Sequence, residues 1–368
     1  MVETGLRLEV PRSALVERLA LVVRAVSTRT AVLVLGGIQL RAAEGELQLA
    51  ATDMELSLRT SLEADVADEG EAVVPGRLLL DIARSLPDAD VAIEQAVGES
   101  IVSLTCGSAS YRIHTYSAED FPRLPVIDIS RLQTVDRDAL VETVARVGRS
   151  ASRDESRPVL TGILVRFEPG KIVMAATDSY RLAVKETRSE SVVPELEAII
   201  PARALQELGR IDAGELQLGL YENHVVFGNG ETWLTTRRID GQFPNYRQLL
   251  PDQFEHELRL PREELLDVVR RVSVMAQRNS PLRLRFVEGE LAVSAQTQDV
   301  GEARESLPAP FVGEPLEIGF NAEFLRDGLE SIDSPTVTLK LISPLRPAVL
   351  EGETPDYTYL IMPIRLAG

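Results

Sequence analysis

Three segments of the chain share one arrangement of apolar and polar residues. Each starts with a short alternating stretch, typical of a strand, and continues with apolar residues three and four apart, typical of an amphipathic helix. The segments span residues 6–30, 132–154 and 258–279. The apolar faces of the three predicted helices comprise Leu15, Leu19, Val22 and Val26; Leu140, Val144 and Val147; and Leu265, Val269 and Val272.

The starts of these helices give the length of a repeat. Proline or aspartate suits a helix N-terminus, and Pro11, Asp136 and Pro261 occupy that position at intervals of 125 residues. A second helix follows in every copy, and each is preceded and followed by strand-like sequence. These second helices are predicted at 75–88, 201–212 and 320–333.

A closing motif and hairpin signals complete each copy. The closing motifs are "DFPRLP" at 120–125, "QFPNYRQLLP" at 242–251 and "LIMPIRL" at 360–366. Glu-Asn and Gly-Asn-Gly within residues 215–239 indicate hairpin turns between short strands. The sequence therefore predicts an α+β fold of three tandem repeats, each with two helices and antiparallel sheet. The predicted domains are 1–127, 128–252 and 253–368.

The tripeptide Ala-Thr-Asp occurs twice at the repeat interval. It stands at 51–53 and at 176–178, and a degraded version, "AQTQDVGEA", spans 295–303. One interpretation is a simple turn, because aspartate bonds nearby backbone N–H groups and ends strands. The other is that Asp178 belongs to a functional segment. The residues alone leave both open.

Composition narrows the class of protein. A chain of 368 residues, 44% of them hydrophobic, folds and is too long for one ordinary core. Its single cysteine, Cys106, excludes an internal disulfide, so we expect a reducing, cytoplasmic location. The sequence has neither a long apolar run for a membrane span nor the pattern of a signal peptide.

Motifs of known enzyme classes are missing. The sequence lacks a Walker A loop, a G-x-G-x-x-G after a strand and a G-x-S-x-G. Its three histidines do not have the spacing of metal ligands. Carboxylates are abundant, which is typical of solvated surface, and no motif points to a catalytic pair. We expect no catalytic site, no metal and no cofactor.

Charge and arginine placement point in different directions. The net charge of −18 argues against nucleic acid, because phosphate contacts need Lys and Arg. Arginines nevertheless recur on one face of the repeated helices or just beyond their C-terminal ends. They could complement the helix dipoles, or they could form one basic strip for a phosphate backbone. These arginines are Arg29, Arg146, Arg149, Arg153, Arg271 and Arg278.

Four motifs in order resemble a known family. They are "SRPVLTGILV" at 156–165, "ATDSYRLAV" at 176–184, "GQFPNYRQLLP" at 241–251 and "YLIMPIRL" at 359–366. Together with the repeats, they make the whole chain similar to the bacterial sliding clamp, the β subunit of DNA polymerase III. The resemblance implies a non-catalytic processivity factor: a head-to-tail homodimeric ring that encircles double-stranded DNA. In the family, a basic loop residue at the position of Arg29 faces the duplex, and Arg149 and Arg153 fall in the equivalent region of the second domain. From their positions on or after the repeated helices, we expect Arg146, Arg271 and Arg278 on the same surface.

The resemblance further implies a binding site for short linear peptides between the second and third domains. The expected partners are the replicative polymerase α subunit, the clamp loader, other polymerases and repair proteins. Without the resemblance, "IMPIRL" is better explained as a closing strand with an edge proline; with the resemblance, the peptide site is favoured. The implied site residues are Leu160, Thr177, Ser179, Tyr180, Arg181, Leu182, Pro244, Gln248, Leu249, Asn321, Phe324, Leu360, Met362, Pro363, Ile364, Arg365 and Leu366.

Some residues depart from the family pattern. Ser179 stands where the family often has glycine, and Gln248 where it often has a basic residue. Ala367 and Gly368 extend beyond the usual end. Two rival interpretations remain: a clamp paralogue that serves drug resistance or a specialised polymerase, and an unrelated α+β repeat enzyme.

Overall fold

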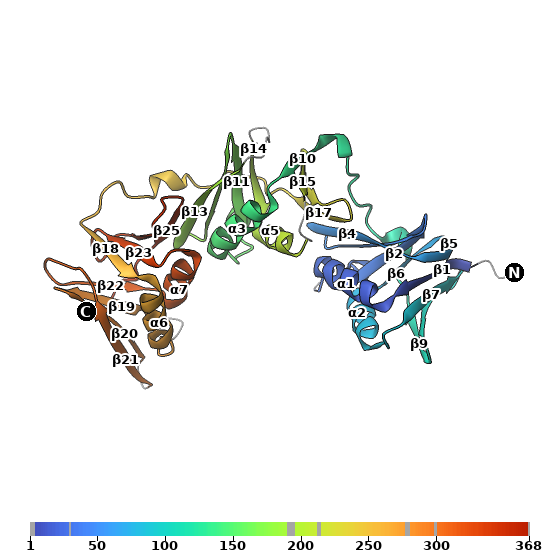
Figure 1. Cartoon of the computed structure of the whole chain (residues 1–368), viewed down its shortest axis with the longest axis horizontal. Helices are drawn as coiled ribbons and strands as arrows, with labels where there is room; N and C mark the ends of the chain where they lie inside the picture. The colour runs from blue at the N-terminus through green and yellow to red at the C-terminus, as the bar shows by residue number, and fades with distance from the viewer. Residues whose placement is uncertain are drawn as a thin grey trace. The chain divides into compact units, whose positions relative to one another are not determined.

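The chain forms two compact units, which share the middle repeat. The computed structural model describes residues 4–28, 31–189, 196–211, 215–276, 280–297 and 300–366. The first unit comprises 1–137 and 207–238, and the second comprises 138–206 and 239–368. Each unit contains two antiparallel sheets with helices packed against them (Figure 1).

The first unit contains an N-terminal sheet and a first junction sheet. In spatial order, the N-terminal sheet consists of β5 (Asp65–Asp68), β1 (Thr4–Pro11), β7 (Asp90–Ala96), β8 (Ile101–Cys106) and β9 (Ala109–His114). The first junction sheet consists of β10 (Leu132–Val135), β15 (Leu216–Leu220), β16 (His224–Gly228), β17 (Thr232–Arg237), β4 (Leu56–Glu63), β3 (Glu46–Thr52), β2 (Gly37–Ala43) and β6 (Gly70–Pro75). Because β17 pairs with β4, this sheet joins four strands of the second repeat to four of the first.

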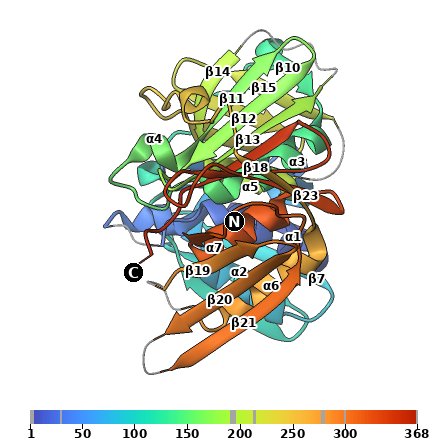
Figure 2. The ribbon, with the colours of Figure 1, turned by 90° about the vertical axis from the view of Figure 1, so that its left-hand side faces the viewer.

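The second unit contains a second junction sheet and a C-terminal sheet. The second junction sheet consists of β14 (Leu196–Pro201), β11 (Gly162–Glu168), β12 (Lys171–Thr177), β13 (Arg181–Arg188), β25 (Tyr357–Ile361), β24 (Ala348–Glu351), β23 (Thr336–Leu341) and β18 (His256–Pro261). The C-terminal sheet, seen in Figure 2, consists of β21 (Gly301–Pro308), β20 (Glu290–Thr297), β19 (Leu282–Val287) and β22 (Leu316–Phe320). Here β13 pairs with β25, so the second repeat is joined to the third.

The repeated helices appear where their apolar periodicity predicts them. The helices α1 and α2 pack together in the first unit, as α6 and α7 do in the second. All ten residues predicted for the apolar faces are buried, which confirms the helix assignment, although Val26 lies beyond the end of its helix. The α-helices are α1 (Arg12–Val22), α2 (Gly76–Ser85), α3 (Arg137–Val147), α4 (Pro158–Thr161), α5 (Ala202–Glu207), α6 (Arg262–Ser273) and α7 (Ala322–Ser331).

Short 3₁₀ turns extend or connect these elements. The helix α5 is shorter than expected, because its last turn tightens into the 3₁₀ helix that follows. The 3₁₀ helices are η1 (Val23–Ala25), η2 (Leu33–Gly36), η3 (Ala118–Asp120), η4 (Ile129–Arg131), η5 (Gly148–Ser150), η6 (Leu208–Arg210) and η7 (Tyr246–Gln248).

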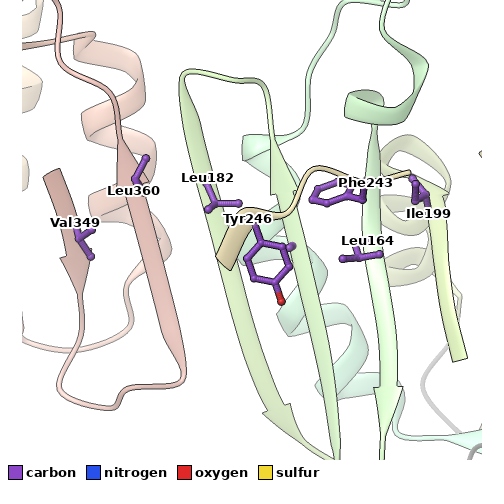
Figure 3. Close-up of a cluster of buried hydrophobic side chains, with 8 residues drawn as sticks. Leu164, Leu182, Ile199, Phe243, Tyr246, Val349 and Leu360 are labelled. Carbon is purple, nitrogen blue, oxygen red and sulfur yellow. The ribbon is translucent and has the colours of Figure 1, made fainter. Parts of the chain in front are cut away.

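The second junction sheet is covered on both faces along β12. One face packs against η5, and the other contributes to an apolar cluster beneath the segment that follows β17. Residues 172–177 are accordingly all buried, and their sequence lacks the alternation of a half-exposed strand. Figure 3 shows Phe243 and Tyr246 of the covering segment above strands that carry Leu164 and Leu182.

Candidate functional site

The second Ala-Thr-Asp motif ends in a hydrogen-bonded turn. The Oγ1 of Thr177 donates to the carbonyl of Arg181 at 2.6 Å. The Oδ1 of Asp178 accepts from the backbone N–H groups of Tyr180 at 2.9 Å and of Arg181 at 3.0 Å. These bonds satisfy the polar groups of the hairpin and fix the direction in which Tyr180 and Arg181 leave the sheet.

The first motif builds the same turn. Thr52 Oγ1 donates to the carbonyl of Leu56 at 3.1 Å, and Asp53 Oδ1 accepts from the N–H of Leu56 at 2.8 Å. The turn interpretation is therefore confirmed for both aspartates. The third residue of each turn has a left-handed backbone, with φ of 77° at Met54 and 80° at Ser179. This conformation favours glycine, so both side chains are held at a cost in backbone strain.

Arg181 is a buried cation at the base of the turn. Its Nε donates to Asp178 Oδ2 at 3.1 Å, and its Nη1 donates to Asp327 Oδ2 at 2.6 Å. The guanidinium also lies 4.2 Å from the centre of the Phe324 ring. Burial alone lowers the pKa of Arg181, but Tyr359 and the two carboxylates outweigh that effect and raise it. Arg181 is therefore a permanent charge with a fixed orientation.

The start of α7 supports this cation. Asn321 Oδ1 accepts from the N–H of Phe324 at 3.1 Å, so Asn321 is the N-cap of the helix. The hydroxyl of Tyr359 donates to the carbonyl of Phe324 at 2.7 Å. Burial raises the pKa of Tyr359, which keeps the hydroxyl protonated as a donor. Both contacts hold the Phe324 ring beneath Arg181.

Leu182 and Leu360 form the apolar floor of the candidate site. They face each other across β13 and β25 and belong to one buried cluster (Figure 3). Phe243 and Tyr246 pack into that cluster from the covering segment, which leaves Pro244, Gln248 and Leu249 exposed on the same segment. Leu160 is also buried, and the neighbouring Val159 packs against the cluster.

The C-terminal segment runs from the turn to the C-terminal sheet. The N–H of Met362 donates to the carbonyl of Tyr180 at 2.9 Å, and that of Ile364 donates to the carbonyl of Gly319 at 2.8 Å. A Cβ at Gly319 would lie 2.6 Å from the Cδ2 of Leu366 and 3.0 Å from the carbonyl oxygen of Ile364, so this close crossing favours glycine. The strand β25 ends at Ile361, so the closing-strand interpretation holds for Ile361 but not for a continuous strand beyond it. Among residues 362–366, Ile364 forms an isolated antiparallel bridge with Gly319.

Four apolar side chains from three segments are exposed around this floor. The exposed fractions are 61% for Tyr180, 50% for Leu249, 40% for Met362 and 37% for Ile364. Of the other predicted residues in this segment, Arg365 is exposed, whereas Pro363 and Leu366 are half-buried. Exposed apolar residues gathered near a buried cation are typical of a surface that binds an apolar anchor with a polar neighbour.

Three residues of this region were not predicted from the sequence. Leu345 is 64% exposed in the turn between β23 and β24, at the end of the sheet that also carries Ile361 and Arg181. Asp327 follows Phe324 by three residues on α7, and that helical spacing was a usable signal. Arg157 donates from Nη1 to Ser179 Oγ at 3.1 Å; it lies in the motif at 156–165 but was not predicted as a site residue.

The arginines predicted to face DNA differ in their surroundings. Arg146 is only 17% exposed, donates to the carbonyl of Ser331 at 3.2 Å and pairs with Asp333 at 3.0 Å. Arg153 is exposed and has no ion-pair partner among the residues that the structure describes. Arg29 and Arg278 lie outside the described residues.

Two further arginines of this set pair with carboxylates of the second unit. Arg149 bonds to Glu330 and lies 3.7 Å from Asp327. Arg271 pairs with Glu305 at 2.8 Å, and both side chains are solvated. A solvated pair such as Arg271–Glu305 is weak, so Arg271 remains able to exchange partners. Arg149 is itself 45% exposed, whereas its two carboxylate partners are largely buried.

A polar cavity of about 210 Å³ lies beside α3 and the end of α7. Lys185, which is 4% exposed, reaches Asp356 at 2.8 Å and Glu142 at 3.7 Å. Glu142 in turn pairs with Arg146 at 2.8 Å. Burial raises the pKa of Asp356, but the hydrogen bond and charge of Lys185 together with the bond from Thr354 outweigh it and lower the pKa below its usual value. These pairs tie the second repeat to the third.

Within the described ranges, no group of three His, Cys, Asp or Glu side chains is placed to hold a metal ion. Every helix in those ranges is too short or too polar to cross a lipid bilayer.

Comparison with known proteins decides the family. Models of the DNA polymerase III beta subunit match in three successive parts: its N-terminal domain at 6–125, its central domain at 134–245 and its C-terminal domain at 247–365. The chain belongs to the DNA polymerase III beta subunit family. The matches confirm the resemblance to the sliding clamp family that the sequence indicated. They also confirm the predicted α+β fold of three tandem clamp repeats.

Individual beta subunits agree over nearly the full length. A beta sliding clamp of Streptomyces coelicolor is 35% identical over 99% of this chain and 100% of its own length. A beta sliding clamp homolog of Streptomyces muensis, GriR, is 32% identical over 98% of this chain and 99% of its own. A crystal structure of a sliding clamp from Pseudomonas aeruginosa bound to griselimycin is 29% identical, covers 98% of this chain and 100% of that one, and has a TM-score of 0.88.

Proposed function

We propose that this chain is a DNA sliding clamp, of which two copies close head to tail around duplex DNA. The ring holds the replicative polymerase and other DNA-processing proteins on the template and catalyses no reaction itself. It acts in the cytoplasm, where replication takes place in bacteria. The observation that carries this proposal is the incomplete sheet at each end of the chain.

Every internal junction combines strands of two successive repeats. The first repeat contributes β4 and the second β17, and the next junction combines β13 with β25 in the same way. The third-repeat equivalent of β4 and β13 is β21, and the first-repeat equivalent of β17 and β25 is β9. Both β21 and β9 are edges of the two terminal sheets. A second copy supplies the missing partner of each edge, and a head-to-tail contact of this kind closes into a ring.

The internal junctions also suggest the register of this contact. Ser57 and Leu182 are the first paired residues after their turns, and they face Thr235 and Leu360 in the junctions. Gly301 is the first paired residue after the corresponding turn of the third repeat. It is therefore the residue of β21 that takes the place of Ser57 and Leu182.

The distance to the Phe-Pro motif aligns β9 with its second-repeat equivalent, β17. Thr235 lies eight residues before the phenylalanine of its motif, and Ile113 lies eight residues before that of the first repeat. Gly301 is thus expected opposite Ile113 of the partner subunit. The antiparallel register then brings Glu302 opposite Arg112 of the partner subunit, and both side chains are exposed in the single chain.

This arrangement also explains the domains. We propose residues 1–127, 128–252 and 253–368 as the three domains of the clamp. The middle domain contributes four strands to each junction sheet. Because each half packs with a different neighbour, the two compact units divide the middle domain between them.

Weak contacts suit a ring that must slide. DNA held by threading needs no tight or base-specific binding, and contacts to phosphates suffice. Because Arg146, Arg149 and Arg271 already pair with carboxylates, a phosphate must compete for them. The net charge of −18 also disfavours DNA binding to the outer surface of the protein. We assign the DNA contacts to Arg29, Arg146, Arg149, Arg153, Arg271 and Arg278.

The apolar surface beside Arg181 is the proposed partner site. Tyr180, Leu249, Met362 and Ile364 offer apolar contact to a Leu or Phe anchor of a linear peptide. Methionine adapts its shape to different ligands, which suits a site with many partners. The griselimycin complex of the related clamp supports a ligand site in this family. Affinities near micromolar, roughly −8 kcal/mol, would allow partners to exchange.

A clamp paralogue is the second candidate. The match to the homolog GriR, which is nearly as similar as the match to the Streptomyces coelicolor clamp, favours keeping it. Both candidates share the ring, and they differ in which partners bind. Binding of a peptide from the replicative polymerase α subunit supports the main clamp, and its absence from a ring that still threads DNA supports the paralogue.

Deletion of residues 362–368 tests the partner site. It removes two apolar side chains of the site and the backbone bonds to Tyr180 and Gly319, so binding of the polymerase peptide should be lost. The dimer should persist, because β9 and β21 are unchanged. Fluorescence anisotropy measures the first and light scattering the second. A matched variant, Met362→Ala, keeps the backbone bonds and should weaken binding without abolishing it. Unchanged affinity after the deletion would overturn the assignment.

A further inference from the structure

Asp327 is shared between two arginines of different surroundings. Its Oδ2 accepts from Arg181 at 2.6 Å, and its Oδ1 lies 3.7 Å from Arg149 Nη1. The exposed fractions of the side chains are 8% for Arg181, 14% for Asp327 and 45% for Arg149. One largely buried carboxylate therefore connects the base of the proposed partner site to an arginine that solvent reaches.

The ion pairs continue along α7. Arg149 also bonds to Glu330, and Arg270 reaches the same carboxylate at 2.9 Å. Burial raises the pKa of Glu330, but the two arginines outweigh burial and lower it, so Glu330 stays charged near neutral pH. Arg149 thus has two acidic partners, and its exposed fraction of 45% leaves it accessible to a phosphate.

The buried end of this chain of contacts controls the partner site. Arg181 is held by Asp327, packs on Phe324 and bonds to Asp178 in the turn that carries Tyr180. The carbonyl of Tyr180 accepts from Met362. Any change in how firmly Asp327 holds Arg181 therefore reaches the exposed side chains that would bind a peptide.

We propose that Asp327 is a positioning residue that couples DNA occupancy to partner binding, an inference that rests on the proposed function. A phosphate that draws Arg149 away removes one of the two cations near Asp327. The carboxylate then interacts with Arg181 alone and holds it more firmly against Phe324. The partner site is better ordered, and the ligand binds more tightly when DNA is present. Reciprocity requires that the ligand strengthen DNA binding by the same factor.

The test measures griselimycin affinity of the full-length protein by calorimetry, with and without a short linear duplex at low salt. For the unmodified chain, the duplex should raise the affinity about fivefold, at the lower end of typical couplings because Arg149 is partly solvated. Arg149→Gln should show the raised affinity without DNA and should not respond to the duplex. Asp327→Asn should bind griselimycin more weakly and also not respond, whereas Asp327→Glu should recover part of both effects.

Arg166→Gln is the matched control for these variants. Arg166→Gln breaks an ion pair with Glu197 on the same unit, far along the sequence from α7, and should behave as the unmodified chain. Because Arg149 is on the surface, its variant should fold, which thermal melting checks. Equal affinities of the unmodified chain and Arg149→Gln, or a duplex response that persists in Asp327→Asn, overturn the coupling alone. Failure of the unmodified chain to bind griselimycin or the duplex overturns the coupling, whereas the ring itself is tested separately by retention on circular DNA.

Discussion

Two non-glycine residues adopt a left-handed backbone at the same position of a repeated turn. Met54 and Ser179 both lie one residue after the aspartate that closes the turn. The aspartate and threonine bonds hold this backbone in place, so the strain is compensated locally. In the second repeat the same turn carries Tyr180 and Arg181, and its geometry therefore determines the proposed partner site.

Replacing Ser179 by glycine should stabilise the protein. A left-handed L-residue costs about 1–2 kcal/mol, and glycine loses about 0.5–1 kcal/mol of that gain through its unfolded-state entropy. The net gain should be about 0.5–1 kcal/mol, measured as a higher melting temperature of the second unit. Ser179→Ala is the control: it removes the bond from Arg157 but keeps the strain, so it should melt at or below the unmodified temperature. A glycine variant that melts lower would show that the bond from Arg157 outweighs the strain.

The sequence predicted the local part of the site better than the distant part. The Ala-Thr-Asp pattern was sufficient for the turn, because all its bonds lie within five residues. The family pattern added Phe324 and Met362. Leu345 was missed, since its importance depends on which segments meet across the sheet, and no local pattern encodes that. Asp327 was missed although its helical spacing from Phe324 was a usable signal.

Ion pairs between helices and strands join the second and third repeats. Lys185 of β13 is buried and bonds to Asp356 in the hairpin before β25. Arg146 of α3 bonds to the end of α7. A buried lysine is costly unless it is paired, so this contact favours the observed packing of the two repeats over alternatives.

The Lys185–Asp356 pair should make stability fall in acid. Because Lys185 lowers the pKa of Asp356 in the folded state, the pair stabilises the fold above the unfolded aspartate pKa of about 3.9. That contribution is lost as pH falls through the lower folded value. The melting temperature should therefore drop more steeply below about pH 4 in the unmodified chain than in Lys185→Met. Parallel pH profiles for the two proteins would contradict this account.

The helices could be predicted from the sequence, whereas the order of the strands could not. The apolar residues at helical spacing located α1, α3 and α6, because burial of one helix face leaves a clear period. The pairing of β4 with β17 and of β13 with β25 was not predicted. Short antiparallel strands from different repeats are alike in pattern, and register depends on which neighbours the chain brings to them.

At the scale of the whole molecule, the two terminal sheets suggest how copies associate. Each internal junction has eight strands, whereas the terminal sheets end in the unpaired edges β9 and β21. Exposed edges of this kind promote pairing with another chain. The strand pairing at the internal junctions therefore suggests how β9 of one copy pairs with β21 of another.

A charge exchange tests the proposed register. Glu302→Arg should weaken the dimer, because it places two arginines opposite each other at both contacts of a ring. Arg112→Glu should do the same, and the double variant should recover most of the association. The dimer dissociation constant, from sedimentation, should rise at least about tenfold in each single variant, since like charges replace an attraction twice. Two single effects that simply add in the double variant would argue against this pairing.

Retention on circular DNA tests the central claim most directly. The clamp would be loaded onto a nicked circular plasmid, freed of unbound protein on a sizing column, and followed after a restriction enzyme cuts the circle. A ring that holds DNA by threading should stay on the circle and leave once the ends are free. Equal release from circular and linear DNA would contradict the encirclement on which the account depends.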